Sequence, residues 1–209
     1  MVKLLFLCRR RADVTHERYA ALLLEGHVPL ALRHHPTMRR YTVNIVEEAL
    51  GAAPPLDSIA ALSFDTLGDF RERLYDSPEG ERTIARDVAG FLGGADAYAT
   101  REHVVRAPEG AARPGVRSPG VKLVLCLRRA AEQPYAVFLR TWFERRIAAV
   151  LARPEVRGYV ANAVEERLTA AAPAYDGIAE VHLAGAPTAD VLHLHGAAAA
   201  YRVAEYVQR

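Results

Sequence analysis

Cysteine, lysine and long apolar runs are all scarce in this chain of 209 residues, and each scarcity excludes a class of protein. Cys8 and Cys126 are the two cysteines, and both lie in apolar stretches, so we expect buried thiols and a reducing, cytoplasmic setting. The apolar stretch after Lys3 has about five residues, against ~7–15 in a secretory signal and ~20 in a membrane helix. We therefore expect a protein that is neither exported nor membrane-spanning.

Net charge is also small. The 27 basic and 25 acidic residues leave a formal charge of +2, too little to favour nucleic acid or a membrane surface as a partner. All lysines and arginines except Lys3 and Lys122 are arginines, a bias that a GC-rich genome explains better than anion binding does. With 51% hydrophobic residues, the composition is that of a globular protein, and a small-molecule partner is compatible with it.

The chain contains an internal repeat. Residues 2–10 match 121–129 at five of nine positions, and residues 41–50 match 159–168 at six of ten, with offsets of 119 and 118. A stretch rich in proline and glycine, 107–119, separates the two copies and predicts a linker. The predicted units are residues 1–107 and 120–209, and the second lacks about 16 residues before its last strand.

Hydrophobic patterning predicts the order of elements in the first copy. Residues 2–9 are nearly all apolar, which is typical of a strand buried on both faces. Thr15 is placed to cap the first helix. The first copy then reads as a helix over 15–33, strands over 39–48 and 57–64, helices within 67–91 and a last strand over 98–106. This βαββαβ order is ferredoxin-like and α+β, and two bare sheet faces can close against each other.

Several motifs of the first copy resemble a known family. They are Leu23-x-x-x-His27-x-Pro29-Leu30, Tyr41-x-x-Asn44, Asp57-x-Ile59-Ala60-x-Leu62-x-Phe64, Ser77-Pro78-Glu79-Gly80 and Glu102-His103-Val104-Val105. Together they are similar to the EthD family of dimeric α+β barrel proteins. The resemblance implies tandem ferredoxin-like repeats that form an intramolecular dimeric α/β barrel. The second repeat is shortened and degenerate: Trp142 occupies the family's tryptophan position, but Arg146 replaces the histidine four residues later.

The resemblance also implies an activity. We expect a cofactor-independent dehydratase or cyclase, a lyase or isomerase acting on an aromatic or polyketide-like small molecule in secondary, antibiotic-type metabolism. Two alternatives stay open: a cofactor-independent oxygenase of the same fold, and a non-catalytic accessory protein that binds a small molecule. No cofactor, nucleic acid or membrane partner is expected. The chain is expected to be a monomer with an internal pseudo-dimer, or a homodimer.

His27 is the candidate catalytic residue. Pro29 lacks a backbone N–H, so it leaves the carbonyl of Glu25 unpaired and bends the helix near His27, which favours an imidazole that projects into a cleft. A neutral imidazole can accept and return a proton near pH 7. The competing interpretation is a packing histidine that hydrogen-bonds a nearby carbonyl.

Other polar residues are candidates for substrate binding, and each has a structural alternative. Asn44 and Asn162 are amides at matching positions of apolar strands, which either brace the strand or anchor a ligand carbonyl. Asp57 opens a strand and suits turn capping, and Glu102 faces either a pocket or solvent. The remaining candidates are Tyr41, from the family motif, and a set in the second copy that suggests a separate pocket: Trp142 with Arg146 at a spacing of four, and Glu180 with His182 at a spacing of two.

Two histidine pairs, His34-His35 and His193-x-His195, suggest metal binding, but neither has further ligands at a recognisable spacing. We expect no metal site. The chain also has no Gly-rich phosphate loop, serine nucleophile motif or Cys-x-x-Cys.

Overall fold

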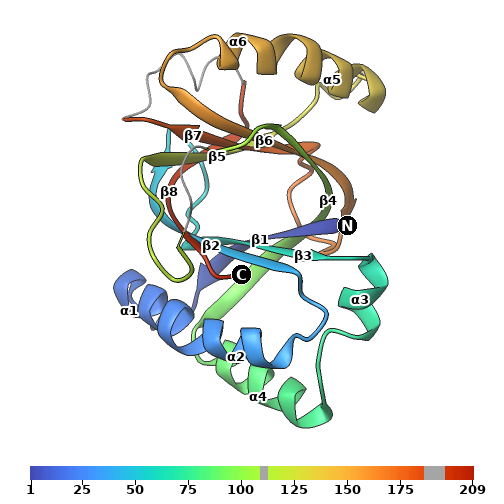
Figure 1. Cartoon of the computed structure of the whole chain (residues 1–209). Coiled ribbons are helices and arrows are strands. Elements are labelled where there is room, and N and C mark those ends of the chain that lie inside the picture. Colours follow the sequence, from blue (N-terminus) through green and yellow to red (C-terminus); the bar gives the residue numbers. More distant parts are fainter. Residues whose placement is uncertain (109–112, 186–195) are drawn as a thin grey trace.

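The computed structural model describes residues 1–108, 113–185 and 196–209 (Figure 1). The first half contains β1 (Val2–Arg10), α1 (His16–Ala21), the π-helical segment η1 (Leu22–His27), α2 (Val28–His34), β2 (Arg40–Leu50), β3 (Ser58–Phe64), α3 (Leu67–Glu72), α4 (Pro78–Ala89) and β4 (Leu92–Arg106). The second half contains β5 (Val121–Leu127), α5 (Tyr135–Thr141), the π-helical segment η2 (Trp142–Arg146), α6 (Ile147–Leu151), β6 (Val156–Arg167), β7 (Gly177–Leu183) and β8 (Ala199–Val207).

The strands form one closed antiparallel barrel in the order β1-β3-β2-β8-β5-β7-β6-β4. Each half contributes four neighbouring strands, and the halves join where β2 pairs with β8 and β4 pairs with β6. The expected α+β class and barrel are confirmed. The two sheets do not stay separate layers, however, because their edge strands pair. Closure pairs both edges of each described four-stranded sheet, which removes a route to aggregation.

The first strand of each half is buried on both faces, as expected. Along β1, Leu5 and Leu7 point into the barrel, whereas Leu4 and Cys8 point outward beneath the helices. This alternation creates an apolar core inside the barrel and a further core under each layer of helices. Figure 1 shows α1, α2 and α4 on one side of the barrel and α5 and α6 on the opposite side.

A π-helical segment interrupts the first helix of both halves. In the first half the N–H of Val28 donates to the carbonyl of Leu23, and in the second half the N–H of Ile147 donates to that of Trp142. The expected distortion near His27 is present, but proline is not required for it, because the second half has Ala148 where the first has Pro29. π-segments are frequent at functional sites, so the distortion itself directs attention to this helix.

The expected helix cap and the expected buried thiols are both present. The Thr15 side chain caps α1 by accepting from the N–H of Arg18. Cys8 and Cys126 are buried free thiols. Among the described residues, no helix is both long and apolar enough to cross a membrane.

Candidate active site

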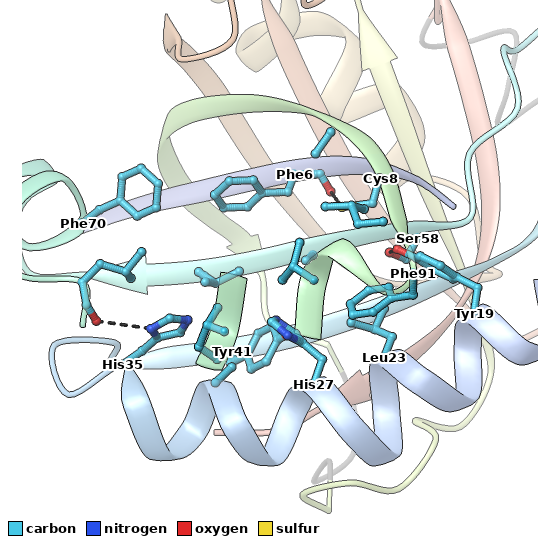
Figure 2. Close-up of a pocket in the computed structure, with 18 of the residues that line it drawn as sticks. Phe6, Cys8, Tyr19, Leu23, His27, His35, Tyr41, Ser58, Phe70 and Phe91 are labelled. Carbon is cyan, nitrogen blue, oxygen red and sulfur yellow. Dashed lines mark hydrogen bonds between the residues drawn. The ribbon is translucent and has the colours of Figure 1, made fainter. Parts of the chain in front are cut away.

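A cavity of about 260 Å³ lies in the first half, between the outer face of the sheet and the helices that cover it. Its wall is mainly apolar, with aromatic rings from both layers (Figure 2). The volume is below the ~300–1,000 Å³ typical of sites for drug-sized ligands, so the cavity suits a small molecule. The lining residues include Phe6, Cys8, Tyr19, Leu23, His27, Ala31, His35, Tyr41, Ser58 and Phe91.

The helix side of the cavity is a stripe in which every fourth residue contributes: Tyr19, Leu23, His27, Ala31 and His35. Residues four apart lie on one face of a helix, which explains why they share the cavity. The predicted acid/base histidine is in this stripe. Tyr19 and His35 were missed as site residues, although their spacing from His27, eight residues in each direction, was a signal available in the sequence.

His27 is held by a carboxylate. Its Nδ1 lies 2.8 Å from Oδ2 of Asp87, a residue of α4. A carboxylate can only accept, so Nδ1 carries the proton and Nε2 has the lone pair. The His27 side chain is 13% exposed, and burial lowers its pKa from the usual 6.5, against the opposing effect of Asp87. The imidazole is therefore neutral near pH 7 and can act as a base through Nε2.

Asp87 was also missed by the sequence argument. It lies on the apolar side of α4, between the buried Ile84 and the cavity-lining Val88. On a helix, residues three apart share a face, so Asp87 lies on the same side of α4 as Ile84. This spacing is visible in the sequence.

His35 is a second buried histidine of the cavity. Its Nδ1 lies 3.2 Å from the carbonyl oxygen of Leu74, and its ring packs 5.3 Å from that of Tyr75. Because the carbonyl oxygen can only accept a hydrogen bond, Nδ1 carries the proton and donates it, and Nε2 is left as an acceptor. Burial lowers the pKa of His35, which keeps it neutral. The predicted residue Tyr41 lines the same cavity from β2, and burial raises its pKa, so it stays protonated.

A pair of hydroxyls lies farther along the stripe. The Tyr19 hydroxyl is 2.7 Å from Oγ of Ser58, which belongs to β3. The Cys8 thiol lines this part of the cavity, and burial raises its pKa to about 11, so it is neutral. Figure 2 shows Tyr19 and Ser58 meeting beside Cys8, with His27 and then His35 following along the helix.

The corresponding space in the second half is filled by aromatic rings. Ser58 corresponds to Gly177 in the barrel. Cys8 pairs with Ser58 in the first half, and the residues 119 positions later, Leu127 and Gly177, pair with each other in the second half. Trp142 lies where the first half has Leu23, and a Cβ on Gly177 would be 2.7 Å from its Cη2 atom. The fully buried indole donates to the hydroxyl of Tyr159 at 2.9 Å. Trp142, predicted to bind substrate, is thus a core residue.

Asn44 and Asn162 point into the barrel, away from the cavity. Nδ2 of Asn44 donates to the carbonyl of Ile59 at 2.8 Å, and Nδ2 of Asn162 donates to that of Ile178 at 2.9 Å. These are the strand-bracing bonds that formed the structural alternative. Within the described residues, Oδ1 of each amide is buried without a hydrogen-bond partner.

Glu102 faces neither the cavity nor open solvent. It binds Lys3 at 2.8 Å and Arg40 at 2.6 Å at one end of the barrel interior. The equivalent Glu205 binds Lys122 in the same way. The two lysines of the chain therefore both neutralise carboxylates inside the barrel, where an unpaired charge would be costly.

Glu180 lies between the two lysines. It is 2.5 Å from Lys3 and 2.6 Å from Lys122, and it also accepts from Asn162. Burial would raise the pKa of Glu180, but the two ammonium groups outweigh it and hold that pKa well below the usual range. Burial and the neighbouring Lys122 lower the pKa of His182 to about 4, so His182 is neutral.

The predicted second pocket does not form. Glu180 and His182 share the inner face of β7, whereas Trp142 packs on its outer face with Val181 and Leu183. Strand alternation places the two sets on opposite sides of the sheet. Arg146, whose position in η2 corresponds to that of His27, is likewise outside the cavity wall.

Asp57 supports a turn. It accepts from the backbone N–H of Arg10 at 2.8 Å and lies 2.9 Å from Nδ1 of His16, and Asp176 accepts from the N–H of Arg129 in the same manner. This is the capping role given as its alternative.

The histidine pairs form no metal cluster in the part of the chain that the structure describes. Nδ1 of His34 is bound to Asp76, and that of His35 to Leu74. His193 and His195 lie outside the described residues.

Comparison with known proteins supports the fold and part of the resemblance. Residues 11–95 match the EthD domain. No curated protein matches the chain significantly in sequence. Among solved structures, an anthrone oxidase-like protein covers 99% of this chain and 93% of its own length, with a TM-score of 0.62 and 12% identity.

Two further structures have the same fold. A protein described as a monooxygenase, from Fusobacterium nucleatum, covers 100% of this chain and 92% of its own length, with a TM-score of 0.53 and 7% identity. A variant chlorite dismutase from Candidatus Nitrospira defluvii, in complex with cyanide, covers 97% of this chain and 90% of its own, with a TM-score of 0.52 and 12% identity. At such identities the likeness establishes the fold alone.

These names contradict the expected dehydratase or cyclase, and with it the lyase or isomerase class and the polyketide assignment. The similar structures are called an oxidase-like protein, a monooxygenase and a chlorite dismutase. They favour the alternative of an oxygenase. A buried base in an apolar cavity serves proton removal in either chemistry, so the sequence pattern could not distinguish them.

Proposed function

We propose that the chain is a cofactor-independent oxygenase that oxidises an apolar aromatic small molecule in the cavity of its first half, with His27 as the base. One observation carries the proposal: a neutral histidine, oriented by Asp87, stands in an otherwise mainly apolar, aromatic-lined cavity. The oxidase-like and monooxygenase names of proteins with this fold support the choice of oxidation over elimination of water.

Oxidation without a cofactor requires a substrate that can supply electrons to dioxygen itself. Nε2 of His27 would remove a proton from an activated CH₂ group, leaving a delocalised carbanion. One electron passes to O₂, the two radicals combine, and His27 returns the proton to form a hydroperoxide. Loss of water then leaves a ketone, so R₂CH₂ and O₂ become R₂CO and H₂O. A positioned base contributes ~10²–10⁴-fold, and an apolar cavity holds the flat substrate beside it.

The division of labour between the halves forms part of the proposal. We infer that the chain is a tandem pair of EthD-like units, residues 1–107 and 120–209, in which the second unit closes the barrel and has lost its cavity. Polar residues present at matching positions in both halves, such as Asn44 and Asn162, bind other parts of the barrel. By contrast, two polar residues of the cavity have no such counterpart: His27 corresponds to Arg146 and Ser58 to Gly177.

Oxygen uptake with His27→Gln tests the proposal. With anthrone as substrate, the wild-type protein should consume O₂, and the variant should lose ~10²–10⁴-fold in kcat/KM with little change in melting temperature. Uptake should persist after exhaustive chelation. A packing histidine would give the reverse, a loss of stability with uptake intact, and that result would remove His27 from the site.

Two further results would also contradict the proposal. Turnover that proceeds at an unchanged rate without O₂ would exclude an oxygenase. Tight binding of anthrone without any turnover would favour the non-catalytic binding protein. Tyr159→Phe is the matched control, because Tyr159 is buried in the second half away from the cavity and should leave oxygen uptake unchanged.

A further inference from the structure

The hydroxyl pair of Tyr19 and Ser58 is a polar site in the cavity that the proton transfer at His27 does not use. Both groups are buried, Tyr19 and Ser58 each with no exposed surface, and they lie 2.7 Å apart. A hydrogen bond between two hydroxyls uses one of their two protons. The second proton faces the sulfur of Cys8, a weak acceptor that both hydroxyls contact, so a ligand oxygen would be a stronger acceptor for it.

Comparison of the two halves indicates that folding does not require this pair. Tyr19 corresponds to Phe138 and Ser58 to Gly177, and those residues are buried without either hydroxyl. In that half an indole occupies the space. The hydroxyls are therefore present in the half that has the cavity and missing from the half in which that space is filled.

The pair is also close enough to His27 to contact the same ligand. Phe91 packs edge-on against both rings, with centroid distances of 5.5 Å to Tyr19 and 5.6 Å to His27. The Tyr19 and His27 rings are consequently no more than about 11 Å apart. A flat molecule of two or three fused rings can span this separation.

We propose that the Tyr19–Ser58 hydroxyl pair binds a carbonyl oxygen of the substrate, so that the substrate is an aromatic ketone whose acidic C–H group lies at His27. The proposal rests on the function proposed above. When His27 takes the proton, the electron pair of the C–H bond delocalises onto the carbonyl oxygen and forms an enolate. The hydroxyl pair then donates to that negative oxygen, and hydrogen bonds to charged groups are stronger than those to neutral ones. No electron leaves the substrate in this step.

The test compares two unreactive probes under nitrogen, anthraquinone and anthracene, which share a three-ring frame but differ in carbonyl oxygens. Wild-type protein should bind anthraquinone more tightly. In the double variant Tyr19→Phe/Ser58→Ala the affinity for anthraquinone should fall about 10–100-fold, while that for anthracene stays within about twofold. Each single variant should lose less, because the remaining hydroxyl regains its proton for the ligand.

A matched control separates binding from folding. Tyr159→Phe removes a buried hydroxyl in the second half and should change neither affinity. The proposal is overturned if wild-type protein does not prefer anthraquinone, or if the double variant binds both probes as before or weakens both equally. It is also overturned if the double variant keeps the wild-type rate of oxygen uptake. If the probe preference depends on the pair but oxygen is not consumed, the oxygenase proposal fails and the carbonyl site stands.

Discussion

Transferring three residues of the second half into the first should close the cavity. The variant is Tyr19→Phe/Leu23→Trp/Ser58→Gly, which reproduces Phe138, Trp142 and Gly177 at their corresponding positions. Tyr41 already stands where Tyr159 accepts the indole N–H of Trp142, so the new tryptophan has a hydrogen-bond partner. The structure thus supplies a packed template for the filled state.

The expected effects on stability and activity have opposite signs. Filling a cavity commonly stabilises by about 0.5–2 kcal/mol, and 1 kcal/mol raises the melting temperature of a chain of this size by roughly 2–4 °C. Oxygen uptake should be lost, because the space for the substrate is occupied. The single variant Leu23→Trp retains Ser58, which corresponds to Gly177. A Cβ atom on Gly177 would lie 2.7 Å from Cη2 of Trp142, so we expect the Cβ atom of Ser58 to collide with the new tryptophan in the same way. We therefore expect this single variant to be destabilised by about 1–3 kcal/mol through overpacking.

Urea unfolding of Leu23→Trp, Ser58→Gly and Leu23→Trp/Ser58→Gly measures the coupling energy between positions 23 and 58. The triple variant is measured beside them. A coupling energy near zero, or full oxygen uptake in the triple variant, would refute the argument that Leu23 and Ser58 keep the cavity open.

Two further predictions concern charge. Asp87→Asn removes the carboxylate that raises the pKa of His27 against the effect of burial, so the pKa of His27 should fall further. Because the neutral imidazole is the active form, the acid limb of the pH profile of kcat/KM should move to lower pH. The plateau of kcat/KM should drop about 10–100-fold. An unmoved limb, measured between pH 4 and 8, would contradict this pairing. Glu180→Gln leaves Lys3 and Lys122 undercompensated inside the barrel and should destabilise the protein by about 3–5 kcal/mol in urea unfolding at pH 7. Because the pKa of Glu180 is depressed in the folded protein, its ionisation stabilises the fold above the ordinary pKa of 4.5. This stabilisation is lost as the pH falls through the lower pKa of the folded state. The free energy of unfolding of Glu180→Gln should therefore depend less on pH below pH 4.5. A slope identical to that of the wild type would show that the two lysines do not control this carboxylate.

The order of elements in the first half and the helix that carries His27 could both be predicted from the sequence, because each depends on local patterns. Apolar runs on both faces of residues 2–9 required covering layers on both sides of the sheet, and the structure contains them. The spacing of four from Tyr19 through His27 to His35 was also present, although it was not recognised as one wall.

The faces on which the polar strand residues lie were decided only by the tertiary structure. Because the strands are buried on both sides, period-two alternation shows that Asn44 and Tyr41 differ in direction but not which of them faces the barrel. Asn44, Glu102, Asn162 and His182 were therefore assigned to a cavity that they do not line. Asp87 reaches His27 across 60 residues of sequence, a contact that the packing of α4 creates. Whether the second half keeps the corresponding cavity was likewise undetermined by the sequence, since it depends on how closely the ring of Trp142 approaches the backbone of Gly177.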